Sequence, residues 1–190
     1  HYADELESVF DKPGVTGQKS VVSIDNPIPD PERRRSKTRG EIERDLDDEP
    51  ERGSRYRRVP KRIWENKDSS VKTYLREQYG GKCQICDDTF TKRNGAPYFE
   101  GLYLIPHSQS RWVDRPGNVL CLCATCCAKL MHGHVENEGI INQIKKYKPI
   151  QEGGSGSPSL DILLCGEPVK IRYTERHMLD LQELVLMESN

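Results

Sequence analysis

The sequence predicts a small α+β domain whose thin hydrophobic core is supported by a metal site. Two Cys-x2-Cys pairs stand 36 residues apart, at positions 83 and 86 and at positions 123 and 126. Short apolar runs around them show helical spacing in some places and strand alternation in others. Hydrophobic residues make up 34% of the 190 positions, charged residues 31%, and the mean hydropathy is -0.79. A core this modest usually needs a metal ion or disulfides.

The first segment, residues 1–65, is expected to be a charged, proline-rich linker or extended segment. Residues 41–51 hold seven acidic residues, whereas residues 52–62 hold six basic residues and no acidic one. Such blocks are usually solvated, yet basic side chains beside aromatic ones also suit contact with phosphate. The candidate nucleic-acid contacts in this segment are Arg55, Arg57, Arg58, Lys61 and Arg62. Because the chain starts at His1, we expect it to be a piece of a longer protein.

Residues 66–150 are expected to form the metal domain. A helix is predicted to begin after a cap at residue 68, 69 or 70 and to end at Gly80-Gly81. Asn94-Gly95 predicts a hairpin turn between strands at Thr89–Lys92 and Pro97–Ile105. A short apolar strand over residues 118–122 should lead to a helix that starts at Cys127–Met131.

A further helix is predicted from residue 138 to 147, capped by Asn137, with Ile140, Ile141 and Ile144 as its apolar face. Residues 151–190 are expected to form a C-terminal β-hairpin-helix extension. After a Gly/Ser linker at 152–158, two alternating runs predict strands at 160–164 and 168–173, joined at Gly166-Glu167. The inward residues of the final helix, capped by Thr174, should be Met178, Leu181, Leu184 and Val185.

The cysteine spacing is typical of a structural zinc site. Zinc prefers four tetrahedral nitrogen or sulfur ligands, and a closed site of four cysteines is structural rather than catalytic. We therefore expect one zinc ion per chain, and its ligands are predicted to be Cys83, Cys86, Cys123 and Cys126. Cys121 and Cys127 leave other pairings open. Cys165 is expected to be a small apolar filler.

The cysteine count also bears on the compartment. Seven cysteines are an odd number, and a secreted disulfide framework more often shows an even count and a signal peptide. The sequence has no apolar run of 18 residues, so we expect no membrane span. Reduced thiols indicate an intracellular protein, cytoplasmic or, in a eukaryote, nuclear.

Four stretches of the chain resemble an HNH endonuclease domain of the McrA type: Tyr79–Cys86, Tyr98–Glu100, Ile105-Pro106 and Gly117–Cys126. The resemblance covers about residues 70–135. It implies a ββα-metal nuclease motif on a zinc-stapled treble-clef core. It also implies a loop near the nucleic acid, in which Arg111 and Arg115 become candidate phosphate contacts.

The positions at which this family carries its catalytic groups are mostly changed in this chain. Leu102 and Tyr103 stand where the family has its metal-binding residue and its general base. Leucine cannot bind a metal, and tyrosine, with a reference pKa of about 10, is a poor base at neutral pH. Cys127 and Met131 replace the two later histidines, and only Asn118 matches the motif.

The preferred interpretation is therefore a degenerate HNH-like zinc module without catalytic activity. It would bind nucleic acid, with DNA expected rather than RNA, or a protein partner. Such modules resemble appendages of larger ATPase- or helicase-type proteins of nucleic-acid processing or defence, of which this chain would be the C-terminal part.

Two alternatives stay open. The first is an active endonuclease that uses Mg²⁺ or Mn²⁺ and the displaced histidines His107, His132 and His134. The second is a purely structural or oligomerisation domain, which would neither cleave nor retain DNA.

Overall fold

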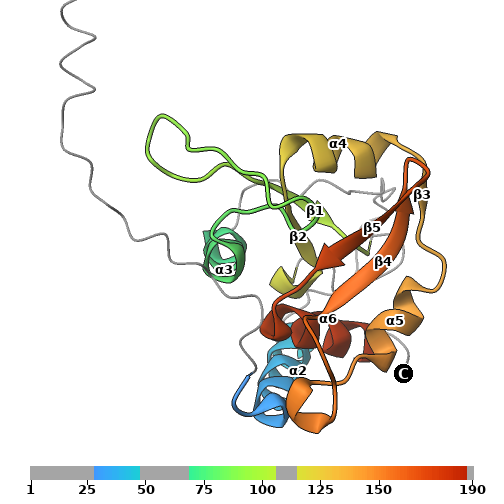
Figure 1. Ribbon diagram of the computed structural model, residues 1–190. Coiled ribbons are helices and arrows are strands. Elements are labelled where there is room, and N and C mark those ends of the chain that lie inside the picture. Colours follow the sequence, from blue (N-terminus) through green and yellow to red (C-terminus); the bar gives the residue numbers. More distant parts are fainter. Residues whose placement is uncertain (1–27, 48–68, 106–114, 188–190) are drawn as a thin grey trace, which may run out of the picture.

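The computed structural model describes residues 28–47, 69–105 and 115–187. Within these ranges, five α-helices and two small antiparallel sheets form a mixed α+β fold (Figure 1). The elements in chain order are α2 (Pro31–Asp47), α3 (Ser69–Tyr79), β1 (Glu100–Tyr103), η1 (Pro116–Asn118), β2 (Val119–Leu122), α4 (Ala124–His132), β3 (Val135–Glu136), α5 (Ile140–Lys146), η2 (Ile150–Glu152), β4 (Ser159–Leu164), β5 (Glu167–Arg172) and α6 (Glu175–Met187).

The first sheet pairs β1 with β2 in antiparallel register, with Leu102 opposite Leu120. The expected hairpin of Thr89–Lys92 with Pro97–Ile105 is confirmed only next to its turn, where the two limbs share one isolated antiparallel bridge between Thr91 and Pro97. The turn itself forms, and the Gly95 N–H donates to the Lys92 carbonyl at 2.9 Å. All four residues of β2 and the last three of β1 are buried, so pairing these strands removes far more apolar surface from water.

The second sheet has the order β3-β4-β5. The two strands predicted at the C-terminal end are confirmed, but they are joined at Cys165 and Gly166, both with positive φ (54° and 83°). The strand β3 was not predicted, since two residues are too short to show alternation. Cys165 is exposed in this turn, so the expectation of an apolar filler is wrong.

One core cluster joins the two sheets, and it includes side chains from β1, β2, α4, α5, β4, β5 and α6. This cluster contains residues from both sides of position 150, so it marks no boundary there. The division into domains 66–150 and 151–190 stays a prediction. A smaller cluster packs α3 against the other face of the first sheet, where it covers Tyr103, Val119 and Cys121. The helix predicted before Gly80-Gly81 is thus confirmed as α3.

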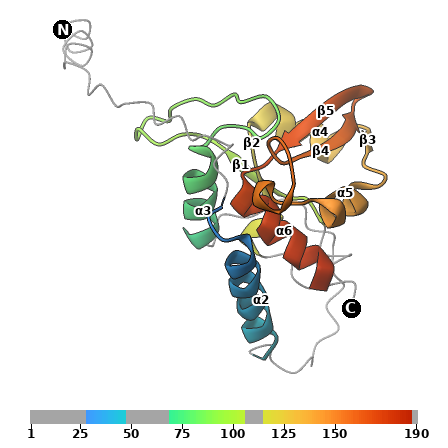
Figure 2. The same cartoon turned by 60° about the horizontal axis from the view of Figure 1, so that its bottom comes forward.

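The C-terminal helix α6 lies in the middle of the molecule, between the second sheet and α2 (Figures 1 and 2). The predicted inward face is confirmed, since Met178, Leu181, Leu184 and Val185 are all buried. Five polar side chains of this helix are almost fully buried, and each has a partner: Glu175, His177, Asp180, Gln182 and Glu183. Gln182, for example, donates from Nε2 to three carbonyls at the end of α5, of Ile144, Lys145 and Tyr147, at 2.9–3.2 Å. It thereby satisfies carbonyls that the helix end leaves open.

The helix α2 lies within the segment predicted to be a linker, and for residues 31–47 that expectation is wrong. Its sequence is polar on nearly every face, so it lacks the apolar stripe from which a helix could be predicted. It is held to α6 by arginine-carboxylate pairs instead: Arg34 Nε donates to Asp180 Oδ1 at 2.6 Å, and Arg39 Nη2 lies 3.0 Å from Glu183 Oε2. Asp180 and Glu183 are almost fully buried, and Ile42 is 1% exposed.

The two middle helices differ in their ends from the prediction. α4 begins at Ala124, earlier than expected, because Cys123 is its N-cap. α5 is shorter than predicted and begins at Ile140, with Gly139 in the left-handed region as N-cap. Ile140 and Ile144 are buried as expected, but Ile141 is 38% exposed. A helix of seven residues presents only two of the three isoleucines to the core.

We predict that Asp180→Ala lowers the free energy of unfolding by about 3–5 kcal/mol. Asp180 also accepts hydrogen bonds from Thr38 Oγ1 and the Tyr74 hydroxyl. Without its carboxylate, the side chains of Arg34, Thr38 and Tyr74 all lose their acceptor, and the first of these is charged. Urea denaturation checks this. The control is Asp161→Ala, whose partner Lys170 is solvent-exposed and whose cost should stay under about 1 kcal/mol. Equal small effects would contradict this role of Asp180.

A second prediction concerns His177, which is fully buried. Its Nε2 lies 3.0 Å from the Gly117 carbonyl and its Nδ1 lies 2.6 Å from the Tyr79 hydroxyl. A carbonyl only accepts, so Nε2–H donates to Gly117 and Nδ1 accepts from Tyr79. A Cβ at Gly117 would lie 2.9 Å from the Asp180 Cβ, so the close approach of η1 to α6 requires glycine. Burial lowers the pKa of His177 from 6.5 to about 4.

Above pH 6.5 this histidine is neutral in both states and contributes no pH dependence. As pH falls from 6.5 to about 4, only the unfolded state takes up the proton, so stability falls by on the order of 3 kcal/mol. Urea titrations across this range should show a shallower pH dependence in His177→Gln than in the parent chain. Loss of a bound metal at low pH would affect both proteins alike. Identical slopes would contradict the prediction.

Candidate metal centre

Four cysteine side chains from two distant parts of the chain meet at one point. The sulfur atoms of Cys83, Cys86, Cys123 and Cys126 all lie within 4.8 Å of one another. Cys86 Sγ is 3.6 Å from both Cys123 Sγ and Cys126 Sγ, and all seven cysteines are free thiols. Four sulfurs at about 2.3 Å from a tetrahedral zinc ion lie roughly 3.8 Å apart. The cluster is therefore compatible with one zinc ion.

The first cysteine pair sits in a tight turn directly after α3. The Asp87 N–H donates to the Cys83 carbonyl at 3.0 Å, and Asp87 has a positive φ of 61°. Gly81 is needed at the entrance to this turn, because its φ is 83° and a Cβ there would lie 2.5 Å from the Pro97 Cβ. The turn thus folds Cys83 and Cys86 to the same side.

The second pair spans the start of α4. Cys123 is the N-cap, and its sulfur accepts the Cys126 N–H at 3.4 Å. This places Cys123 and Cys126 one turn apart at the helix N-terminus, where backbone N–H groups and the helix dipole favour a thiolate.

The charges of the thiols also fit a cation. Burial works against the charge of Cys123, but the Cys126 N–H and the neighbouring thiols outweigh it, and the pKa of Cys123 is lowered. Burial, followed by the charge of Cys83, raises the pKa of Cys126, and burial raises that of Cys86. Four thiolates cannot share this space without a positive charge between them. A divalent soft metal supplies that charge, and the thiols are deprotonated when they bind it.

Gln84, between the first two cysteines, ties the candidate centre to the rest of the fold. Its side chain accepts from the Cys121 N–H at 2.8 Å and donates to the Arg172 carbonyl at 2.8 Å. Its backbone carbonyl accepts from the Arg172 N–H at 2.9 Å. Gln84 is 1% exposed, and it joins the first turn to β2 on one side and to β5 on the other. Sequence reasoning missed Gln84, because a polar residue in a metal-binding turn carries no signal of burial.

Arg172 completes this connection and was also missed. Its Nη1 lies 2.6 Å from Asp87 Oδ2, and its Nη2 donates to the Ile85 carbonyl at 3.1 Å. The end of the C-terminal hairpin is therefore fastened to the first cysteine turn through both backbone and side chain.

The remaining cysteines lie outside the cluster. Cys121 is fully buried in β2, and burial raises its pKa. Cys127 is buried in α4, where burial and a hydrogen bond to Glu100 raise its pKa to about 12. Glu100 also accepts a hydrogen bond from the Tyr98 hydroxyl. Neither sulfur belongs to the group of four that meet at one point, in keeping with the choice of Cys123 and Cys126 as the second pair.

The positions that match HNH catalytic residues are occupied by structural side chains. Leu102 and Tyr103 are buried in β1, at 3% and 5% exposure. The Asn118 side-chain amide is hydrogen-bonded to the backbone of Ile105: Oδ1 accepts from the N–H and Nδ2 donates to the carbonyl, both at 2.8 Å.

The displaced histidines are only partly described. His132 is exposed at the end of α4, and His134 Nε2 lies 3.1 Å from Glu136 Oε1. His107 lies outside the described residues. Among the residues that the structure describes, the four cysteines are the only group of three or more metal-ligating side chains close enough to bind an ion.

Of the predicted nucleic-acid contacts, the structure describes only Arg115. Its guanidinium donates to the Glu41 carbonyl, so it connects η1 to α2. The others lie outside the described residues: Arg55, Arg57, Arg58, Lys61, Arg62 and Arg111. Their role stays a prediction.

Comparison of the chain with protein-family models, with curated proteins and with solved structures finds no match. In the described part of the chain, none of the helices has the length and apolar character needed to cross a bilayer. The four-cysteine cluster is therefore the feature on which a functional argument rests.

We predict one zinc ion per chain in protein purified under reducing conditions, measured by elemental mass spectrometry. Cys83→Ser should lose the zinc, because a hydroxyl is a far weaker ligand than a thiolate. Cys121→Ser is the matched control, since Cys121 is equally buried but outside the cluster, and it should keep the zinc. Full zinc content in Cys83→Ser, or none in the parent chain, would contradict the assignment.

Proposed function

We propose that this chain is a zinc-stapled, degenerate HNH-like module that binds nucleic acid, DNA in the first place. The observation that supports it most directly is the four-thiol cluster at the junction of β2 and α4. The order β1, β2, α4, with α4 packed on both strands, is a ββα arrangement within the stretch that resembles HNH domains. A treble clef around zinc agrees with this arrangement.

In this role the module carries out no hydrolysis. Metal-assisted cleavage needs an ion to polarise the phosphate and a base to activate water. Leu102 supplies neither, and the Tyr103 side chain is inside the second hydrophobic cluster. Asn118 holds the backbone at the end of β1 instead of orienting a catalytic partner.

The support for nucleic acid as the partner is the resemblance together with the charge of the sequence. The stretch from residue 52 to 62 carries six basic side chains and includes Tyr56. Such a stretch suits phosphate contact and base stacking, which bind with little sequence preference. The module would then act as one part of a larger ATPase- or helicase-type protein of nucleic-acid processing or defence, and would hold the nucleic acid on which that protein acts.

We predict that the chain retains DNA in a salt-dependent manner, measured by fluorescence anisotropy at several salt concentrations. Changing Arg55, Arg57 and Arg58 together to Gln should weaken binding and reduce the slope of log K against log salt by about 0.9 for each lost phosphate contact. The matched control changes Lys145, Lys146 and Lys148, three exposed cations near the end of α5, to Gln. The control should bind like the parent chain.

The same protein should not nick plasmid with Mg²⁺ or Mn²⁺. Metal-dependent nicking that His107→Ala or His132→Ala abolishes would replace this function by the nuclease alternative. Absence of any salt-dependent DNA retention would contradict nucleic-acid binding and favour a protein partner or an oligomerisation role.

A further inference from the structure

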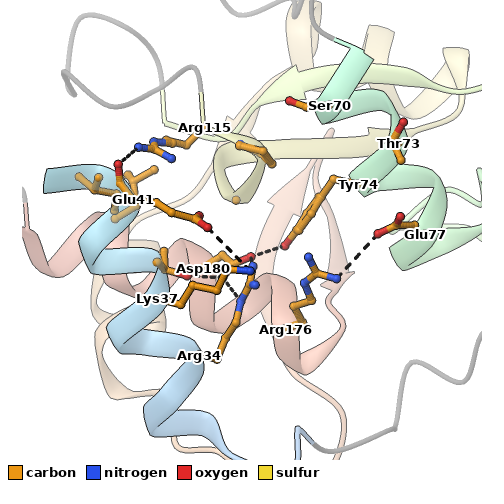
Figure 3. Close-up of a pocket in the computed structure, with 15 residues that line it drawn as sticks. Arg34, Lys37, Glu41, Ser70, Thr73, Tyr74, Glu77, Arg115, Arg176 and Asp180 are labelled. Atoms are coloured by element: carbon orange, nitrogen blue, oxygen red, sulfur yellow. Dashed lines mark hydrogen bonds and ion pairs between the residues drawn. The ribbon is translucent and has the colours of Figure 1, made fainter. Parts of the chain in front are cut away.

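We propose that the pocket between α2, α3, η1 and α6 binds a phosphomonoester group. The pocket has a volume of about 390 Å³ and is lined by side chains from these four elements (Figure 3). It is separate from the cysteine cluster and goes beyond the proposed function. Four cationic side chains line it: Arg34, Lys37, Arg115 and Arg176.

The floor of the pocket is a guanidinium that is held in one orientation. Arg34 donates through Nε and Nη2 to the Asp180 carboxylate, which also accepts from Thr38 and Tyr74. Asp180 is thereby fully engaged and neutralised. Arg34 keeps donors on Nη1, for which no described residue acts as an acceptor. A fixed guanidinium with spare donors is well suited to bind a phosphate oxygen.

The wall opposite α2 carries a donor that lacks an acceptor. Arg176 Nε is buried and has no hydrogen-bond partner among the described residues. The guanidinium lies over the Tyr74 ring, 5.1 Å from its centre, and Nη1 is 3.8 Å from Glu77 Oε2. A buried donor without a partner costs free energy, which an acceptor in the pocket would recover. Figure 3 shows Arg176 and Tyr74 side by side at the pocket.

Lys37, like Arg176, has only a long contact with a carboxylate. Lys37 Nζ is 4.0 Å from Glu41 Oε1, and both side chains are exposed, so their pairing contributes little. Ser70 and Thr73 line the side formed by α3. An anion entering here can draw Lys37 and Arg176 from their exposed carboxylates at small cost.

These features favour a phosphomonoester over other anions. A terminal phosphate carries close to two negative charges and three strong acceptor oxygens, and can meet donors from α2, α3 and α6 at once. The volume suits one nucleotide-sized ligand and is too small for a duplex. The phosphate can therefore come from a free small molecule or from the 5′ end of a nucleic acid.

The test is isothermal titration of the full chain with AMP and with inorganic phosphate at constant ionic strength. Arg176→Gln should weaken AMP binding about tenfold, the usual effect of one charge-assisted hydrogen bond. Glu77→Gln should strengthen it, because it frees Arg176 and removes a repulsive carboxylate. Arg93→Gln, an exposed arginine that does not line the pocket, is the matched control and should bind like the parent chain.

The opposite signs expected for Arg176→Gln and Glu77→Gln separate a binding site from a merely structural role. No binding of AMP or phosphate by the parent chain overturns the proposal, as does equal binding by Arg176→Gln. Two oligonucleotides, with and without a 5′ phosphate, identify the source. Tighter binding of the phosphorylated one, lost in Arg176→Gln, assigns a nucleic-acid end. AMP binding without that difference assigns a free phosphomonoester.

Discussion

The convergence of four cysteine sulfurs is the constraint on which the rest of the structure depends. It brings together two turns that are 36 residues apart in the chain and sets the angle at which α4 leaves β2. Gln84 transmits this constraint outward, because it is bonded to β2 and β5 at once. The C-terminal hairpin and α6 therefore pack against a fixed point, and the single core cluster forms between them. In a chain with so few apolar residues, binding of a metal would add directly to folding free energy.

Away from the cysteine cluster, pairs of buried polar side chains hold the helices together. On α6, His177, Asp180, Gln182 and Glu183 are all buried, and their partners come from α2, α3, η1 and α5. Such pairs are directional, so they fix how the helices meet even where apolar contact is sparse. They also create the pocket, since the arginines that α2 and α6 bring to the junction face a space that the side chains do not fill.

The sequence was sufficient for the elements with a local pattern. The cysteine pairs, α3, the two C-terminal strands and α6 were predicted because spacing or alternation within a few residues defines them. Three features depend on distant partners and were missed. Strand β1 pairs with β2 rather than with the limb before Asn94, α2 is stabilised by the acids of α6, and Gln84 is buried only because β5 returns to it. In each case the deciding contact lies more than 15 residues away.

The central claim is best tested by zinc K-edge X-ray absorption on the purified chain. We expect the zinc ion to be surrounded by four sulfur atoms at about 2.3 Å, without nitrogen or oxygen ligands. A shell with fewer sulfurs and added nitrogen or oxygen atoms, as in a histidine-containing site, would contradict it.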